Sequence, residues 1–377
     1  MNAPFELPDG NVAANADFPR WSSFGPYYAM FPVDFARSVV SEYTSEGDGI
    51  FDPFSGRGTS IFCAAELGRR GIGVELNPLG WLYGTVKLNP GRKELVLARL
   101  THIDAASGEF QRDAEALPEF FHRCFCEKVR SFLVAARSLL NWSESKIDRT
   151  LMGFILVYLH GKIERGRANA LSNQMRQTKA MAPDYSIRWW TKNGMADPPT
   201  VNPADFLRKR IEWRYEKGKP TFASRLAEIR QGDCRTVTPR IRSDLVGSCR
   251  LLLTSPPYCG VTSYYYDQWL RFWMLGDLDR PTTDEEWKGK FANLTDYQSL
   301  LDDAFSSARR MMAEDAVIYV RTDKRPNTLD ATLSALDHAF PEWSVKTEDS
   351  PFPRDTQTAL FGDRSKKPGE VDVILHR

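Results

Sequence analysis

Residues 49–60 have the sequence Gly-Ile-Phe-Asp-Pro-Phe-Ser-Gly-Arg-Gly-Thr-Ser. Its apolar start predicts a short strand over Gly49–Asp52, and the glycines that follow predict a tight turn. A helix over Ser60–Arg69 and a second strand over Ile72–Glu75 would complete one βαβ unit. Such a unit implies parallel strands joined by a right-handed crossover. The stretch therefore predicts an α/β fold.

Outside this unit the pattern of apolar residues changes twice. Before it, a helix is expected over Val33–Tyr43, after a breaker-rich arm in the first twenty residues. From 109 to 220 the chain is amphipathic at helical spacing, and strands are predicted again at 228–233, 251–254, 316–320, 343–347 and 371–375. We therefore expect a doubly wound, mostly parallel, Rossmann-like sheet with an inserted, mainly helical subdomain. The expected division is the N-terminal arm and first half of the sheet domain at 1–108, the helical insertion at 109–220, and the second half of the sheet domain at 221–377.

The composition excludes several classes of protein. Among 377 residues the longest strongly apolar run, Leu151–Leu159, is much shorter than the ~20 residues of a membrane span, and the N-terminus has no signal-peptide pattern. A cytoplasmic location without membrane partners is the default expectation. The six cysteines include no CxxC pair, so we expect reduced thiols and no metal site.

Positive charge is concentrated in one segment. The net charge of the whole chain is +1, but residues 121–230 contain 21 Lys and Arg against 10 Asp and Glu. Phosphate binding depends on local potential, so this segment predicts a nucleic-acid-binding face; a solvated, basic surface is the alternative.

The turn after the first strand has the features of a cofactor loop. Gly56 and Gly58 allow close approach of the backbone to a ligand, and Glu75 ends the second strand where an acid can bind a ribose diol. A dinucleotide site has the same geometry. However, the third glycine is missing, and Asp52-Pro53 puts an anion where a pyrophosphate requires amides. The acid favours a cationic cofactor, S-adenosylmethionine.

A second motif, Ser255-Pro256-Pro257-Tyr258, follows the buried strand at 251–254. Prolines stiffen the loop and leave carbonyl oxygens as fixed acceptors. The hydroxyl of Ser255 and a proline carbonyl could accept both hydrogens of an exocyclic amine, and Tyr258 offers a stacking face for a base. No strong general base is needed, because the amine becomes acidic only after methyl transfer.

The two motifs together resemble those of the amino-methylating DNA methyltransferases of the SPPY type, over most of 20–90 and 228–377. The resemblance implies a catalytic loop at Ser255, Pro256, Pro257 and Tyr258. It also implies a cofactor site formed by Tyr27, Phe31, Asp52, Pro53, Phe54, Gly56, Gly58, Thr59, Glu75 and Asp233. Within that site, the segment from Tyr27 to Phe31 would close over the methionine end, and Asp233 would meet the adenine amine. Arg57 departs from the small residues common at its position.

The resemblance also implies double-stranded DNA as the substrate, base flipping, and a setting in restriction-modification or related defence. Serine at the first position of the catalytic loop favours N4 of cytosine, with N6 of adenine next. Methylation at a ring carbon is disfavoured, because the chain contains no Pro-Cys dipeptide. The presence of a nuclease partner stays open.

The basic insertion is the candidate target-recognition region. Its cationic side chains with the potential to contact phosphate are Arg165, Arg167, Arg176, Lys179 and Arg188. Of the aromatic residues after the catalytic loop, Trp269, Phe272 and Trp273 are expected in the core, whereas Tyr264, Tyr265 and Tyr266 are candidates for a base pocket.

Three other functions remain open. RNA guanine-N2 methyltransferases resemble the chain in the same two motifs. A non-catalytic DNA-binding subunit would keep the fold, although it would not need both motifs. A nicotinamide oxidoreductase fits least well.

Overall fold

The computed structural model describes most of the chain. The described residues are 18–27, 31–164, 167–220, 222, 227–241, 245–260, 264–281, 293–350 and 369–377. The first 17 residues of the predicted N-terminal arm lie outside them, whereas residues 18–20 of that arm begin a short helix, α1 Phe18–Ser22.

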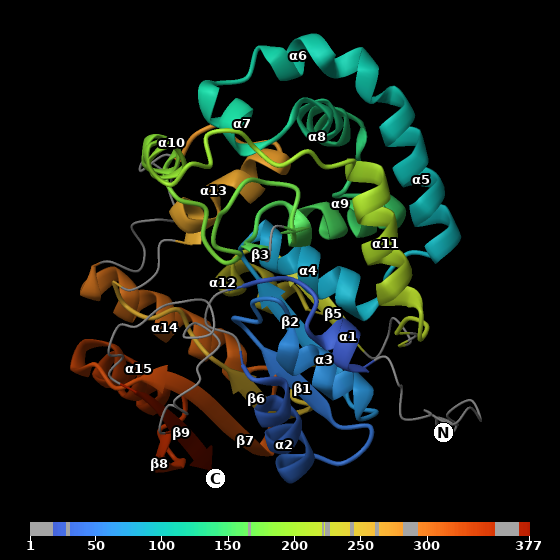
Figure 1. The fold of residues 1–377 in the computed structure, drawn as a ribbon. Coiled ribbons are helices and arrows are strands. Elements are labelled where there is room, and N and C mark those ends of the chain that lie inside the picture. Colours follow the sequence, from blue (N-terminus) through green and yellow to red (C-terminus); the bar gives the residue numbers. More distant parts are fainter. Residues whose placement is uncertain are drawn as a thin grey trace.

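A seven-stranded sheet forms the base of the molecule (Figure 1). The strands occur in the order β5-β2-β1-β6-β7-β9-β8; the first five are parallel, and β9 is antiparallel to both β7 and β8. Their bounds are β1 Gly49–Asp52, β2 Arg70–Glu75, β5 Ala227–Gln231, β6 Cys249–Thr254, β7 Met312–Asp323, β8 Ser344–Ser350 and β9 Glu370–His376. The expected mostly parallel α/β sheet is confirmed.

Alternate residues of the central strands supply two separate cores. Side chains point to opposite faces along a strand, so neighbours in sequence pack on different sides. Ile50 and Leu253 pack with α2 and α3, whereas Phe51 and Leu252 pack with α14 and α15. The covering helices are α2 Val33–Tyr43, α3 Thr59–Glu66, α12 Cys234–Val237, α14 Leu294–Arg309 and α15 Pro326–Ala339, with the 3-10 turn η2 Thr238–Arg240 beside α12. Both faces of the sheet are thereby covered.

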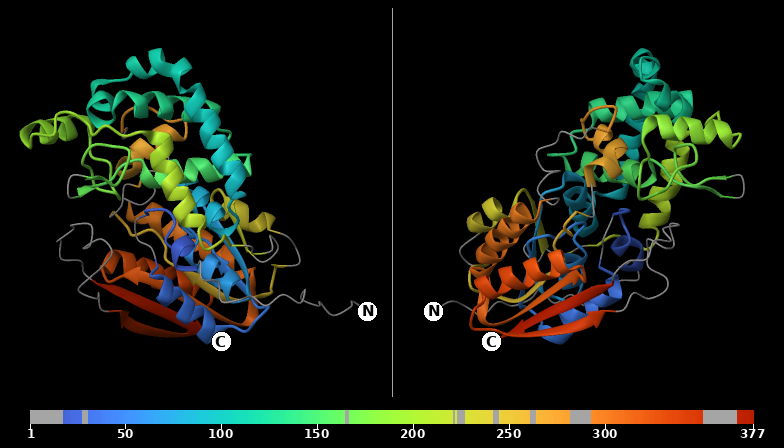
Figure 2. Two further views of the ribbon diagram at one scale, coloured as in Figure 1. Left: turned by 45° about the vertical axis from the view of Figure 1, so that its right-hand side comes forward. Right: turned by 90° about the vertical axis from the view of Figure 1, so that its left-hand side faces the viewer.

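A helical layer lies over the edge of the sheet at which the parallel strands end (Figures 1 and 2). Most of it comes from the predicted insertion, and α5 and α13 pack with it. Its elements are α1 Phe18–Ser22, α4 Pro78–Leu88, α5 Lys93–Ala106, η1 Ser107–Phe110, α6 Gln111–Glu115, α7 Glu119–Cys124, α8 Glu127–Leu139, α9 Lys146–Tyr158, β3 Ile163–Glu164, β4 Arg167–Ala168, α10 Pro183–Lys192, α11 Pro203–Tyr215 and α13 Tyr264–Met274.

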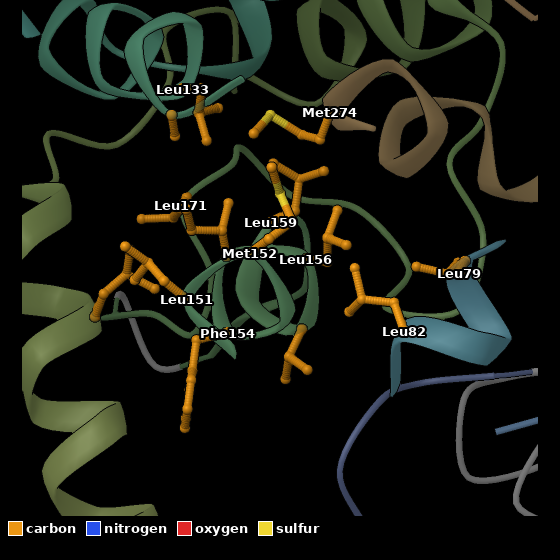
Figure 3. Close-up of a cluster of buried hydrophobic side chains, with 14 of the residues drawn as sticks. Leu79, Leu82, Leu133, Leu151, Met152, Phe154, Leu156, Leu159, Leu171 and Met274 are labelled. Atoms are coloured by element: carbon orange, nitrogen blue, oxygen red, sulfur yellow. The ribbon is translucent and has the colours of Figure 1, made fainter. Parts of the chain in front are cut away.

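The core of this layer is centred on α9 and extends into α4. Figure 3 shows Met152 and Leu156 of α9 surrounded by side chains from other elements, among them Leu79 and Leu82 of α4. All four of these side chains are fully buried. Because α4 follows β2 directly, the helical layer and the sheet share one packed region.

The aromatic residues of α13 lie in the same core. Trp269, Phe272 and Trp273 are buried, as predicted. Tyr265 is also buried and stacks on Phe272 with ring centroids 4.9 Å apart, so its predicted place in a base pocket is wrong. Tyr266 is partly buried, and the side chain of Tyr264 lies outside the described residues.

All six cysteines are free thiols. Among the described helices, none combines the length and the apolar character needed to cross a membrane.

Candidate active site

The direction in which the strands are added reverses between β1 and β6. From β1 the chain adds β2 and β5 on one side, whereas β6, which pairs with β1, leads to β7 on the other. In open α/β sheets the crevice beyond the strand ends at such a reversal is the usual ligand site. The two predicted motifs begin at the ends of these two strands.

A buried carboxylate joins the two motifs. Oδ1 of Asp52, the last residue of β1, accepts a 2.7 Å hydrogen bond from the hydroxyl of Thr254, the last residue of β6. The backbone amide of Phe54 donates to the same oxygen at 3.1 Å, and the hydroxyl of Ser60 donates to the other oxygen. The start of the cofactor loop and the start of the catalytic loop are therefore held together by one side chain.

Burial makes Asp52 a weaker acid than usual. Its side chain is 1% exposed, and loss of hydration raises its pKa to about 6 against the effect of the three donors. At neutral pH the group is mainly ionised, so it adds negative charge to the bottom of the crevice.

Two glycines shape the cofactor loop. Gly58 has φ of +69°, where other residues are strained, and it begins α3 as the N-cap. A Cβ at Gly58 would also collide with the side chain of Ile229 on β5. Gly56 has φ of +54°, and a Cβ there would lie 3.5 Å from the ring of Tyr27. The positive φ angles fit the predicted tight turn, and the predicted close approach of the backbone to a ligand stays a prediction.

Glu75 ends β2 beside this loop, and its carboxylate faces several donors. The amide of Asn77 donates to Oε1 at 2.8 Å, and further hydrogen bonds come from the amide of Gly56 and from the hydroxyl of Tyr27. Burial, the largest effect, raises the pKa of Glu75 to about 8 despite these donors. A group that already accepts a hydroxyl from Tyr27 has the chemistry needed to accept the hydroxyls of a ribose.

A cavity of about 30 Å³ opens between the two motifs. Six predicted cofactor residues line it: Tyr27, Phe31, Asp52, Phe54, Gly56 and Thr59. The predicted catalytic residue Ser255 also lines it, as do Ser55 and Arg57, which were not predicted. The residues between Tyr27 and Phe31 lie outside the described residues. Residues from three distant parts of the sequence thus meet at one cavity.

Arg57, a cavity residue that was not predicted, has a buried guanidinium group. It is 5% exposed, and its Nη1 donates to the backbone oxygen of Gly25 at 2.9 Å. Burial and, to a smaller extent, the charge of the nearby Arg214 lower its pKa to about 10. Its Nε has no hydrogen-bond partner. Arg57 therefore ties the cofactor loop to the N-terminal segment that covers it. The sequence signal that could have identified Arg57 as a site residue is that it replaces the small residue usual at this position.

Asp233 follows β5 at the same edge of the sheet, and its carboxylate is paired with Arg235. As N-cap of α12 it accepts a 2.9 Å hydrogen bond from the amide of Arg235. The guanidinium of Arg235 also donates to both carboxylate oxygens, the shortest contact being 2.6 Å. Binding of an adenine amine by Asp233 would have to share the carboxylate with this cation.

The four predicted catalytic residues occupy a short loop after β6. Ser255 is partly exposed and faces the cavity, whereas Pro256 is buried. The hydroxyl of Tyr258 donates a 2.9 Å hydrogen bond to Oε1 of Glu370, the first residue of β9. Sequence reasoning did not identify Glu370.

The predicted DNA-binding cations differ in their surroundings. Arg176 and Arg188 are exposed, the latter on α10, which projects from the helical layer (Figure 2). Nζ of Lys179 forms a 2.6 Å ion pair with Asp267 of α13. Arg165 lies outside the described residues, as does the side chain of Arg167.

Comparison with known proteins identifies related sequences. Residues 9–79 match a family model described as DNA methylase. The type II methyltransferase M.Cfr9I of Citrobacter freundii is 40% identical over 54 residues, 14% of this chain and 18% of that protein. The type II methyltransferase M.BsoBI of Geobacillus stearothermophilus is 22% identical over 328 residues, 78% of this chain and 62% of that protein. The matched regions thus span less than two thirds of these relatives.

Among solved structures, an rRNA methyltransferase, AviRa of Streptomyces viridochromogenes, aligns over 98% of this chain and 93% of its own. Its sequence identity is 13% and its TM-score is 0.31.

Proposed function

Since the comparisons support the resemblance to the N4/N6 amino-methylating DNA methyltransferases, we propose that this chain transfers a methyl group from S-adenosylmethionine to an exocyclic amine of DNA. The observation that carries the proposal is the shared cavity. Asp52 and Ser255, which belong to the two motifs, line it together.

The residues around the cavity fit a cationic cofactor. Asp52 lines the cavity as a buried acid, and burial of an acid is costly unless a cation or hydrogen-bond donors offset it. Glu75, whose pKa of about 8 keeps it mainly protonated at neutral pH, supports the binding of ribose and not that of the positive charge. S-adenosylmethionine, when bound, supplies an electrophilic methyl group. Glu75 would accept the ribose hydroxyls, Gly56 and Gly58 would let the backbone approach, and Tyr27 would cover the site.

The catalytic loop provides what an amine needs to react. The hydroxyl of Ser255 and a carbonyl of the adjacent proline pair would accept the two amine hydrogens, which directs the nitrogen lone pair away from the ring plane. Tyr258 would stack on the base. An amine inside a duplex cannot reach the loop, so the target nucleotide would be flipped out, at a cost of a few kcal/mol.

We propose N4 of cytosine as the target, because serine begins the catalytic loop; N6 of adenine is the next candidate. The exposed cations Arg176 and Arg188 support binding of the DNA backbone by the helical layer, and the names of the relatives favour a restriction-modification setting. Lys179, held by Asp267, is the weaker candidate for phosphate contact.

Methyl transfer from labelled S-adenosylmethionine tests the function directly. Duplex DNA, single-stranded DNA and transfer RNA are offered separately, and the products are digested to nucleosides and identified by mass. N4-methylcytosine in the duplex is the expected product. N6-methyladenine would correct the target base, and N2-methylguanine in RNA would replace the DNA assignment. Binding of the cofactor without transfer to any of the three would favour a non-catalytic DNA-binding subunit.

A further inference from the structure

The contact between Tyr258 and Glu370 connects the catalytic loop after β6 to the start of β9, two strands away in the sheet. The two residues are 112 positions apart, and the phenolic hydroxyl donates to Oε1 at 2.9 Å. A hydrogen bond to a carboxylate is shorter and stronger than a neutral one, and it fixes the direction of the donor. The ring of Tyr258 is therefore held at both ends, by the loop backbone and by β9.

Residues of the neighbouring strand β7 contact Glu370. Glu370 stands opposite Asp323 in the pairing of β7 with β9, at the edge where β7 ends. Nε of Arg321 lies 4.0 Å from the second carboxylate oxygen of Glu370, Oε2, which leaves Oε1 for Tyr258. The Glu370 side chain is 23% exposed, so solvent reaches only part of it.

Arg321 does not move freely, because several groups hold it. It donates to both oxygens of Asp372, at 2.6 and 2.7 Å, and its guanidinium lies 3.5 Å from the ring centroid of Phe35. Phe35 in turn packs against Phe31, a cavity residue, with ring centroids 5.4 Å apart. A continuous set of contacts thus runs from the cavity wall through Arg321 and Glu370 to Tyr258.

We propose that Glu370 is a positioning residue, which holds the Tyr258 ring in the orientation that receives the flipped base. An untethered tyrosine on a loop would have to be ordered at each turnover, at a cost in side-chain entropy. The proposal rests on the proposed methyl transfer, since it assigns Tyr258 its partner in that reaction.

The test compares Glu370→Leu, Glu370→Gln, Tyr258→Phe and the double variant Glu370→Leu/Tyr258→Phe on unmethylated plasmid DNA. We expect Glu370→Leu and Tyr258→Phe each to lower kcat about tenfold, the effect of losing a hydrogen bond to a charged group. The double variant should be no slower than either single one, and Glu370→Gln should restore most of the rate, because its amide oxygen still accepts. Dissociation constants for S-adenosylmethionine should stay within about twofold.

Glu342→Leu is the matched control. Glu342 is an exposed acid just before β8, at the opposite edge of the sheet, and it contacts Arg377 at 3.6 Å. Its replacement should leave kcat and the melting temperature unchanged. Wild-type kcat in Glu370→Leu, or additive losses in the double variant, would overturn the proposal.

A second measurement does not depend on activity. The chain has 13 tyrosines, and fluorotyrosine labelling gives each a fluorine signal that can be assigned by its loss on substitution. The signal of Tyr258 should shift in Glu370→Leu and stay in place in Glu342→Leu. An unmoved signal contradicts the tether even if no substrate is found. Absence of transfer by the wild type, together with a shifted signal, would instead count against the proposed function alone.

Discussion

The hydroxyl of Thr254 donates a 2.7 Å hydrogen bond to Oδ1 of Asp52, although 202 residues separate the two in the sequence. Both side chains are buried, and both end neighbouring parallel strands. The contact fixes the start of the cofactor loop relative to the start of the catalytic loop.

Removing this hydroxyl should weaken both the fold and the reaction. In Thr254→Val, which keeps the shape, Asp52 loses one of its donors while remaining buried. We expect a loss of about 1–3 kcal/mol in the free energy of unfolding, measured with denaturant. Thr347→Val, at an exposed position of β8, is the control and should change little. Equal stabilities of the two variants would show that the contact contributes nothing.

Glu75 should make stability depend on pH. Its pKa is raised by burial to about 8 in the folded protein, above the usual 4.5, and that of Asp52 is raised to about 6. The folded state then binds more protons than the unfolded state, so both groups favour folding most at low pH. Buried Lys87 and His160 have lowered pKa values and act in the opposite direction, so the contribution of Glu75 is the difference between the wild type and Glu75→Gln. The free energy of unfolding of the wild type relative to this variant should fall as the pH rises from about 4.5 to 8. Denaturant titrations at several pH values, in the absence of cofactor, measure both proteins. A difference between the two proteins that stays flat or rises with pH over this range would contradict the assignment.

Ser255 should act on the reaction and not on cofactor binding. We expect Ser255→Ala to lower kcat about 100-fold, because a fixed acceptor for the reacting amine is lost. Calorimetric titration with S-adenosylmethionine should give a dissociation constant close to that of the wild type. Tyr258→Ala should behave in the same way. If both variants transfer methyl groups at the wild-type rate, the assigned roles are wrong.

Arg188 and Lys179 should differ in their effect on DNA binding. Arg188 is exposed on α10, so Arg188→Ala should weaken binding to duplex DNA and reduce the slope of log affinity against log salt by about one. Lys179 is engaged with Asp267, so Lys179→Ala should mainly lower the melting temperature. Fluorescence anisotropy at several salt concentrations separates the two. If Lys179→Ala weakens DNA binding more than Arg188→Ala does, the DNA contact would lie nearer to α13 than to α10.

Local sequence patterns predicted the strands and loops that form the site, because those features depend on nearby residues. The strand over Gly49–Asp52 and the helix over Val33–Tyr43 have the predicted bounds. Glu75 lies near Gly56, as a βαβ unit requires. The expected places of these residues around a bound cofactor stay predictions.

Contacts between distant elements could not be predicted in the same way. Nothing near Tyr258 in the sequence points to Glu370, because their meeting depends on the antiparallel return of β9 beside β7. The burial of Tyr265 likewise depends on how α13 is packed, since three consecutive tyrosines carry no signal of which one faces inward. Arg235 is close to Asp233 in sequence, but their pairing depends on the cap geometry of α12.

The core in Figure 3 restricts how the insertion, the proposed target-recognition region, could be exchanged. Leu79 and Leu82 pack into the same cluster as α9, although α4 leaves the sheet before the insertion begins. A transplant cut at residues 109 and 220 would leave these leucines facing a foreign surface, with voids or clashes. A workable chimera would exchange α4, α5 and α13 together with the insertion, or would keep the interior and alter only exposed positions such as those on α10.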